Sequence, residues 1–254
     1  MKKATRNFTK IFSISVVLLS GLACNILTPR PVPTPAPPTP TSTPIPLSGQ
    51  VTLVSQASNE TNQTPPFTIT SATPQLTGSD DPRVSAFNQR LKDLVAKEVD
   101  TFRQEFLQNT APTVTNGSSL NVTYTLLSQV GEIWSFKFDF DFYSDGAAHP
   151  GLYSITLNYD LSRGKELALA DLFLPNSDYL GALSNYCIAE LSKQPFFEGP
   201  FAEGAQPTVE NYRNWNITSD GLMITFDEYQ VAPYAAGPQK VVVPYSELRS
   251  LIDP

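Results

Sequence analysis

Residues 134–150, WSFKFDFDFYSDGAAHP, decide the expected fold, because the first part of this stretch alternates strictly between aromatic and more polar residues. Successive side chains of a β-strand point to opposite faces of its sheet. We therefore expect a strand whose buried face consists of Trp134, Phe136, Phe138, Phe140 and Phe142. The other face is expected to be exposed to water and consists of Ser135, Lys137, Asp139, Asp141 and Tyr143.

Neighbouring segments predict further strands around this one. The alternation recurs after the turn, at Tyr153, Ile155, Leu157, Tyr159 and Leu161, and this pattern predicts an antiparallel hairpin partner. Upstream, residues 120–129 are rich in strand-forming residues. Residues 50–56 and 67–71 predict two more strands, and the polar residues 58–66 between them predict a loop.

A long helix is predicted before these strands. In residues 82–108, Pro82 follows two aspartates that can cap a helix, and apolar residues then recur every three or four positions. Glu98 interrupts this apolar stripe. A second helix is expected from a cap at Asn176 or Ser177 to about Lys193, with an inner stripe of Leu180, Leu183, Cys187 and Leu191.

The last part of the chain predicts a β-hairpin around Asp220-Gly221, formed by residues 215–218 and 222–226. A final strand is expected at 241–243 and a short helix after Pro244. Together these elements predict an α+β fold, with an antiparallel sheet or sheets on which one long N-terminal helix and a second helix pack.

The N-terminus predicts export. Basic residues precede an apolar run at residues 11–19 that is too short for an ordinary membrane span, which is typical of a signal peptide at residues 1–23. The sequence Ser20-Gly21-Leu22-Ala23-Cys24 resembles a bacterial lipobox, although Gly21-Leu22-Ala23 also suits ordinary signal peptidase. We expect cleavage before Cys24, lipidation of Cys24 and an extracytoplasmic lipoprotein that is anchored in the membrane.

Residues 24–48 are dominated by proline and threonine. Proline lacks the amide donor of helices and sheets, so we expect a stiff stalk in the polyproline II conformation. The ectodomain then covers residues 49–254, as one unit or as two lobes at about 49–118 and 119–254. A disulfide between Cys24 and Cys187 requires that Cys24 is not lipidated, because a lipidated cysteine has no free thiol. We expect Cys187 to pack in the core.

The charge balance limits the classes of partner. A net charge of −7 and a pI of about 4.7 argue against nucleic-acid binding and favour a cationic partner. No motif for a nucleotide, a metal or a catalytic triad is present, so we expect no cofactor and no metal.

Three polar residues are the candidates for chemistry. Asp139 and Asp141 share one strand face about 7 Å apart, by the usual strand rise, and such carboxylates can act as acid and base on a sugar. The plainer interpretation is a solvated sheet face. His149 is expected to bond to local backbone, with ligand contact as the alternative.

Several segments resemble a known family. Residues 146–150 (GAAHP), 158–161 (NYDL), 171–173 (DLF) and 226–238 are similar to the C-terminal ectodomain of the lysozyme-sensing anti-sigma factor RsiV. Residues 73–78 and the long helix resemble the module that precedes it, which also accompanies deacetylases of the PdaC type. The resemblance implies an extracytoplasmic binding module.

The sequence therefore predicts a non-catalytic cell-envelope lipoprotein that binds a cationic, lysozyme-like hydrolase or an envelope glycan such as a peptidoglycan fragment. The loop 226–238 has the composition of a contact surface, and a packed loop that closes the fold is an equal alternative. Candidate binding residues are His149, Tyr229, Tyr234, Asp139 and Asp141. The rival hypothesis is an envelope enzyme that acts on peptidoglycan through Asp139, Asp141 and His149.

Overall fold

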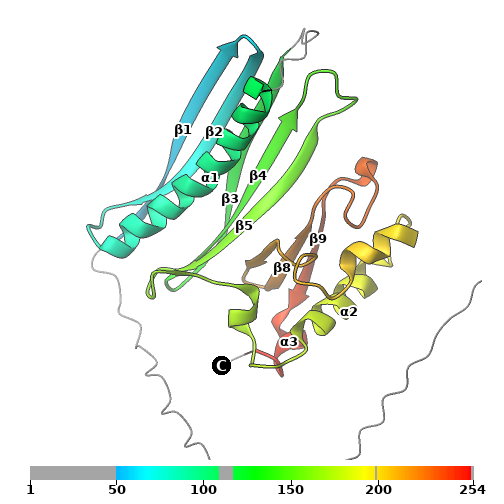
Figure 1. Cartoon of the computed structure of the whole chain (residues 1–254). Coiled ribbons are helices and arrows are strands. Elements are labelled where there is room, and N and C mark those ends of the chain that lie inside the picture. The colour runs from blue at the N-terminus through cyan, green and yellow to red at the C-terminus, as the bar shows by residue number, and fades with distance from the viewer. Residues whose placement is uncertain (1–49, 109–116, 198, 253–254) are drawn as a thin grey trace, which may run out of the picture. The chain divides into compact units, whose positions relative to one another are not determined.

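The structure, a computed structural model, describes residues 50–108, 117–197 and 199–252 (Figure 1). The predicted signal peptide, the predicted lipidation site Cys24 and the proline-rich stalk lie outside these residues. The described part of the chain is an α+β fold with two sheets, which confirms the predicted fold class. None of its helices is both long and apolar enough to cross a membrane.

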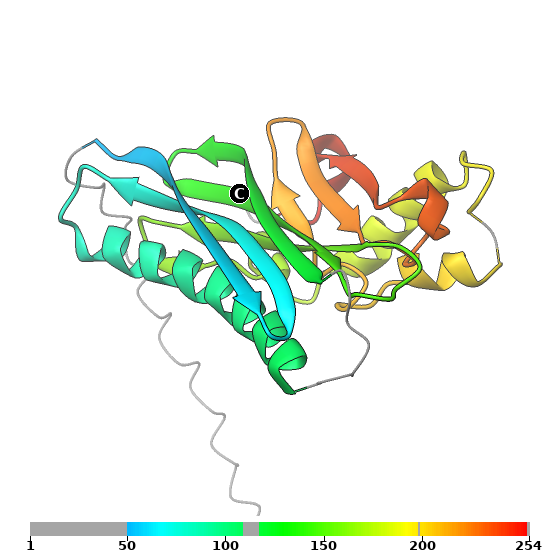
Figure 2. The same cartoon turned by 90° about the horizontal axis from the view of Figure 1, so that it is seen from above.

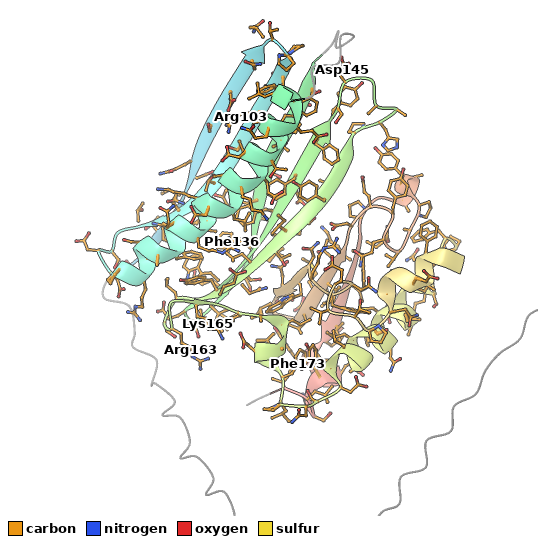
Figure 3. All side chains as sticks on the ribbon, viewed as in Figure 1. Arg103, Phe136, Asp145, Arg163, Lys165 and Phe173 are labelled. Carbon is orange, nitrogen blue, oxygen red and sulfur yellow. The ribbon has the colours of Figure 1, made fainter. Side chains whose placement is uncertain are left out.

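The larger sheet has six strands in sequential order: β1 (Thr52–Gln63), β2 (Pro66–Thr77), β3 (Ser118–Val130), β4 (Ile133–Tyr143), β5 (Gly151–Asp160) and β6 (Lys165–Glu166). Helix α1 (Pro82–Gln108) lies along one side of this sheet (Figures 1 and 2). Phe136 of β4 faces the helix (Figure 3). Its ring centroid lies 6.1 Å from that of Phe87 in α1. The predicted aromatic face of β4 is therefore confirmed as core.

Glu98, which interrupts the apolar stripe of α1, has a partner at the sheet. The hydroxyl of Tyr153 donates a hydrogen bond of 2.8 Å to its carboxylate. Burial, followed by this hydrogen bond to Glu98, raises the pKa of Tyr153 above its usual value. A carboxylate on the buried side of a helix is thus tolerated because it meets a donor there.

Two expectations about the sheet are wrong. Residues 58–63 were expected in a loop, but β1 continues through them and pairs without a break with β2. Because β1 is an edge strand whose residues are mostly exposed, its polar sequence carries no buried alternation. The sheet was expected to be antiparallel, but β2 and β3 are parallel, since α1 returns the chain to the end from which β2 starts.

The smaller sheet is antiparallel and has the order β7 (Trp215–Ile217), β8 (Gly221–Phe226) and β9 (Gln239–Pro244), which confirms the predicted hairpin. Helix α2 (Tyr179–Leu191) packs on it, and the short α3 (Tyr245–Leu248) follows β9. Short 3₁₀ helices lie at Leu169–Leu172, Gly199–Ala205 and Tyr234–Ala236. A second hydrophobic core fills the space between α2 and the small sheet.

Helix α2 begins later and ends earlier than expected. Asp178, rather than Asn176 or Ser177, caps it and accepts a hydrogen bond of 3.1 Å from the amide of Gly181. Asn176 has a left-handed backbone with φ of 63°, which does not suit the cap position. Cys187 is fully buried in the second core, where desolvation raises the pKa of its thiol to about 12. Its predicted role in packing is confirmed.

Strand β7 crosses the face of the large sheet opposite α1. Polar side chains of the large sheet form hydrogen bonds with the backbone groups on the outer edge of β7. The amide of Trp215 donates to the hydroxyl of Thr156 at 3.1 Å, and its carbonyl accepts from the side-chain amide of Asn158 at 2.8 Å. The amide of Ile217 donates to the hydroxyl of Ser135 at 3.1 Å. We call this set of contacts the β7 junction.

The β7 junction corrects the expectation that one face of β4 is exposed to water throughout. Ser135 is fully buried and Lys137 is 5% exposed, because the small sheet covers this end of the face. The hydroxyl of Ser135 donates to the side-chain oxygen of Asn158 at 2.6 Å and accepts from the side-chain amide of Asn216 at 2.9 Å. Asp141, toward the other end of the strand, is exposed as expected.

Replacing Asn158 by leucine tests the β7 junction. Asn158→Leu is expected to lower the free energy of unfolding by about 2–4 kcal/mol, because it leaves the buried carbonyl of Trp215 without its donor. Urea unfolding followed by circular dichroism measures the change. Thr125→Val, at an exposed position of β3, is the matched control and is expected to change stability by less than about 0.5 kcal/mol. Equal stability of the two variants would contradict the assignment.

The ion pair between Glu60 of β1 and Arg103 of α1 predicts that stability depends on pH. The hydrogen bond from Arg103 lowers the pKa of Glu60 below its ordinary value of 4.5. The stabilisation is therefore present above pH 4.5 and is lost as the pH falls through the lowered pKa. The stability difference between the wild type and Glu60→Gln should shrink from pH 7 to pH 3. A difference that does not depend on pH would refute this account.

Candidate functional site

Three rings gather where the turn between β4 and β5 meets the loop between β8 and β9; those of His149 and Tyr229 are exposed, and that of Tyr234 is partly buried. The rings of His149 and Tyr234 stack with centroids 3.8 Å apart, and those of Tyr229 and Tyr234 stack at 5.8 Å. The hydroxyl of Tyr229 lies 3.3 Å from Nε2 of His149. The other ring nitrogen of His149 lies 2.8 Å from the carbonyl oxygen of Pro150, so the predicted bond to local backbone is confirmed. We call these three side chains the aromatic cluster.

The backbone of Tyr229 is in an unusual conformation for an aromatic residue. Its φ is 64°, in the left-handed region that favours glycine, and its side chain is 57% exposed. A non-glycine residue in this region costs about 1–3 kcal/mol. The surrounding structure therefore holds a strained residue whose ring is presented to solvent, an arrangement that is common at binding sites.

A pocket of about 370 Å³ lies between the large sheet and β9. Its floor comes from β3, β4 and β5 and its wall from the start of β9, and it is lined by Asn121, Thr123, Lys137, Asp139, Asp141, Leu152, Pro238 and Lys240. We call it the β4–β9 pocket. Its size is at the lower end of the range for small-molecule sites.

The two aspartates of the pocket differ in their surroundings. Asp139 forms an ion pair with Lys137 and accepts a hydrogen bond of 2.8 Å from the hydroxyl of Ser154. In the part of the chain that the structure describes, the side chain of Asp141 has no hydrogen bond or ion pair. Asp139 therefore has a structural role in the sheet face, whereas Asp141 is available to a ligand.

The aromatic cluster and the β4–β9 pocket are neighbours. The amide of Leu152, which lines the pocket, donates a hydrogen bond of 3.0 Å to the carboxylate of Glu228, the residue before Tyr229. Partial burial raises the pKa of Tyr234, and the charges of Glu228 and Asp141 raise it further. The loop that carries the tyrosines thus lies against the strands that carry the aspartates.

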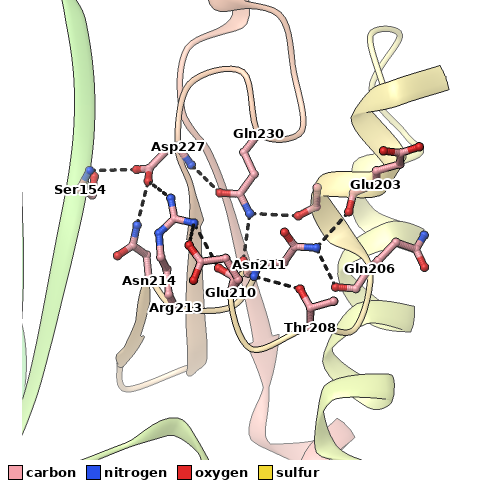
Figure 4. A network of polar contacts seen from close by, with 11 residues as sticks. Ser154, Glu203, Gln206, Thr208, Glu210, Asn211, Arg213, Asn214, Asp227 and Gln230 are labelled. Carbon is pink, nitrogen blue, oxygen red and sulfur yellow. Dashed lines mark hydrogen bonds and ion pairs between the residues drawn. The ribbon is translucent and has the colours of Figure 1, made fainter.

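A buried carboxylate anchors this loop (Figure 4). Asp227 accepts hydrogen bonds from the amide of Ser154 at 2.9 Å, from Arg213 at 2.8 Å and from the side chain of Asn214 at 3.1 Å. Burial raises the pKa of Asp227 above its usual range, while the amide of Ser154 and the guanidinium of Arg213 lower it in part. Since Ser154 belongs to β5, Asp227 joins the loop to the large sheet.

Gln230 extends the anchor toward the 3₁₀ turn after α2. Its side-chain amide donates to the carbonyl oxygens of Gly204 and Asn211, each at 3.0 Å (Figure 4). A β-carbon added at Gly204 would lie only 1.9 Å from the carbonyl oxygen of Gln230, so no larger residue fits there. Tyr229 is therefore held between two anchored residues, although it is itself exposed.

The structure brings all five predicted binding residues to one region of the surface, but it does not join them into one catalytic group. His149 contacts Pro150, Tyr229 and Tyr234, and within the described residues it has no hydrogen bond to Asp139 or Asp141. The described ranges also contain no group of three or more acidic, histidine or cysteine side chains that could hold a metal ion. The geometry resembles a binding surface.

Reasoning from the sequence missed two residues of this region. Lys240 lines the β4–β9 pocket, but a single lysine in a strand carries no local signal. Asp227 was overlooked because its role depends on Ser154, which lies 73 positions earlier in the chain. The sequence Asp227-Glu228-Tyr229 offered only a pair of acids beside an aromatic residue, which is common on solvated loops.

Part of the chain matches a described family. A model of the family "Protein of unknown function (DUF3298)" matches residues 170–246. A crystal structure of a DUF3298 family member from Bacteroides fragilis superposes with a TM-score of 0.58 at 16% identity, and the match covers 82% of this chain and 96% of that one. The fold of the described residues is thus that of solved DUF3298 proteins.

Two curated relatives are similar in sequence. The chain is homologous to the peptidoglycan-N-acetylmuramic acid deacetylase PdaC of Bacillus subtilis, with 30% identity over 165 residues, 64% of this chain and 35% of PdaC. The immunogenic protein MPT64 of Mycobacterium tuberculosis is 30% identical over 107 residues, 42% of this chain and 47% of that protein. The chain therefore spans about a third of PdaC and about half of MPT64. The predicted likeness to PdaC-type proteins is confirmed.

The strain at Tyr229 can be measured by comparing two variants that both lose the ring. Tyr229→Gly is expected to be more stable than Tyr229→Ala by about 1 kcal/mol, because only glycine adopts the left-handed conformation without steric cost. Chemical denaturation of both variants provides the values. At an ordinary position a glycine variant is less stable than an alanine variant. If Tyr229→Gly is less stable than Tyr229→Ala, the backbone of Tyr229 is unstrained.

Proposed function

We propose that this chain is a non-catalytic binding module of the bacterial cell envelope and that the aromatic cluster binds the glycan of the cell wall. The observation that carries the proposal is the stack of His149, Tyr229 and Tyr234 beside the β4–β9 pocket, with His149 and Tyr229 exposed to solvent. A rigid aromatic surface with a few polar groups nearby is the usual composition of a small-ligand site. Sugar rings combine apolar faces with polar rims and match such a surface.

Likeness to PdaC supports a role at the cell wall. PdaC is by name a peptidoglycan deacetylase, and the region that this chain matches is 35% of its length. We propose that the shared region serves to hold an enzyme or a lipoprotein near peptidoglycan. The predicted signal peptide and the lipid anchor at Cys24 belong to the same proposal, with the proline-rich stalk as the spacer from an extracytoplasmic membrane surface.

A cationic, lysozyme-like protein is the second candidate partner, and the charge distribution favours it. All 24 Asp and Glu residues follow residue 49, whereas Lys2, Lys3, Arg6, Lys10 and Arg30 precede it. The folded part is therefore more acidic than the net charge of −7 indicates. Electrostatic attraction would accelerate association with a basic protein. This role is the one implied by the resemblance to RsiV.

The enzyme hypothesis has less support from the geometry. Asp139 is held by Lys137 and Ser154, and His149 is stacked against Tyr234 away from any hydrogen-bonded carboxylate in the described residues. An acid and a base on a sugar need free carboxyl groups that face each other across the bond. Incubation of the protein with muropeptides, followed by mass spectrometry, tests this directly. If the wild type converts muropeptides and His149→Ala does not, the enzyme hypothesis is correct and the proposal of a non-catalytic module is wrong.

Binding to a glycan can be measured by calorimetry with N-acetylglucosamine oligomers. Tyr234→Ala is expected to weaken binding at least about tenfold, since truncation of a central aromatic contact commonly costs more than 1 kcal/mol. Tyr186→Ala, which removes a tyrosine of α2 outside the cluster, is the matched control and should bind as the wild type does.

Hen lysozyme is the probe for the second candidate, and salt separates the two partners. Binding to the neutral glycan should change little between 20 and 200 mM salt, whereas binding to lysozyme should weaken because exposed charges are screened. A heat of binding with lysozyme and none with the glycan would identify the cationic protein as the partner. No heat with either probe at low salt would refute the binding function altogether.

A further inference from the structure

The β4–β9 pocket presents one free charge of each sign. Asp141 stands on β4 and Lys240 on β9, so the two charges come from different sheets and both line the pocket. Within the described residues, neither side chain forms a hydrogen bond or an ion pair, whereas the other two charged residues of the pocket, Lys137 and Asp139, pair with each other. The pocket therefore contains one satisfied pair and two unsatisfied groups.

The floor between these two charges is polar and regular. Asn121 pairs with Asp141 across β3 and β4, and Thr123 pairs with Asp139 in the same way. The side-chain oxygen of Asn121 accepts from Thr70 at 2.8 Å, which directs its amide group away from that bond and leaves the amide as a donor. A ligand in the pocket would thus meet an acceptor at Asp141, donors at Lys240 and Asn121, and an apolar side formed by Leu152 and Pro238.

We infer that the β4–β9 pocket binds a zwitterionic amino-acid or short-peptide group, with its ammonium at Asp141 and its carboxylate at Lys240. This inference rests on the proposed function, because it makes the pocket a second contact for a ligand whose sugar part lies on the adjoining aromatic cluster. A neutral sugar alone would leave both charges without partners. Peptide-substituted glycans carry both kinds of group, so one ligand can occupy the cluster and the pocket together.

The volume agrees with this ligand class. A pocket of about 370 Å³ is large enough for a dipeptide and small for a folded partner. The two charges are exposed, so each contact is worth less than a buried ion pair and specificity depends on their being used together. A ligand with only one of the charges should gain little from the pocket.

The probe is the dipeptide lysyl-alanine, titrated into the full-length protein and followed by calorimetry and by nuclear magnetic resonance. We expect binding by the free dipeptide and at least about tenfold weaker binding by its N-acetylated, C-amidated form, which retains only the lysine side-chain charge. Asp141→Lys and Lys240→Asp should each weaken binding of the free dipeptide by a similar factor. The double variant Asp141→Lys with Lys240→Asp should recover it in part, because a zwitterion can bind in the reverse direction.

Two controls separate the possible causes. Lys97→Asp makes the same charge change as Lys240→Asp on an exposed lysine of α1, and it should leave dipeptide binding unchanged. The N-acetylglucosamine oligomer reports on the aromatic cluster independently. If the oligomer binds and the dipeptide does not, the inference about the pocket is wrong and the proposed function stands. If the dipeptide binds and the oligomer does not, the pocket is confirmed and the glycan function fails.

Equal binding of the free and the doubly capped dipeptide would also overturn the inference, since it would show that the terminal charges of the dipeptide do not contribute to binding. Loss of binding in both single variants without any recovery in the double variant would show a general effect of charge or folding. Circular dichroism of all variants identifies a folding defect. With folded variants, that pattern rejects the paired use of Asp141 and Lys240.

Discussion

The structure depends on the hydrogen bonds that side chains of the large sheet form with the backbone at the outer edge of β7. A strand edge that is buried against another sheet would leave backbone amides and carbonyls without partners, which is costly. Here the side chains of Ser135, Thr156 and Asn158 take the place of a neighbouring strand. The two sheets can therefore meet face to edge, and the β4–β9 pocket lies between them. The anchor at Asp227 repeats this solution on the loop that carries the aromatic cluster.

Local patterns predicted most of the fold, because they depend on neighbours in the sequence. The alternation from Trp134 to Phe142 and the apolar stripe of residues 82–108 each describe one buried face, and both faces are found. The patterns failed where burial depends on distant residues. Ser135 looks like a solvent-facing residue until β7, some 80 positions later, covers it. The parallel pairing of β2 and β3 likewise depends on the path of a helix, which no strand pattern records.

The same limit applies to the site. His149, Tyr229 and Tyr234 could be named from the sequence, because His149 is its only histidine and the loop 226–238 has the composition of a contact surface. Their stacking could not be predicted, since it requires the β4–β5 turn and the β8–β9 loop to meet. Lys240 became a candidate only when its strand was placed opposite Asp141. The sequence thus supplies the chemical groups, and the docking of the two sheets supplies their proximity.

The β7 junction also has a consequence for the order of folding. The hydrogen bond between Asn158 and Trp215 spans 57 positions of the chain, and the one between Ser135 and Ile217 spans 82. The β4–β5 hairpin closes a far shorter loop, and contacts of low sequence separation generally form first. The β4–β5 hairpin should therefore form before the small sheet docks on it. Changes at the junction should then accelerate unfolding more than they slow folding.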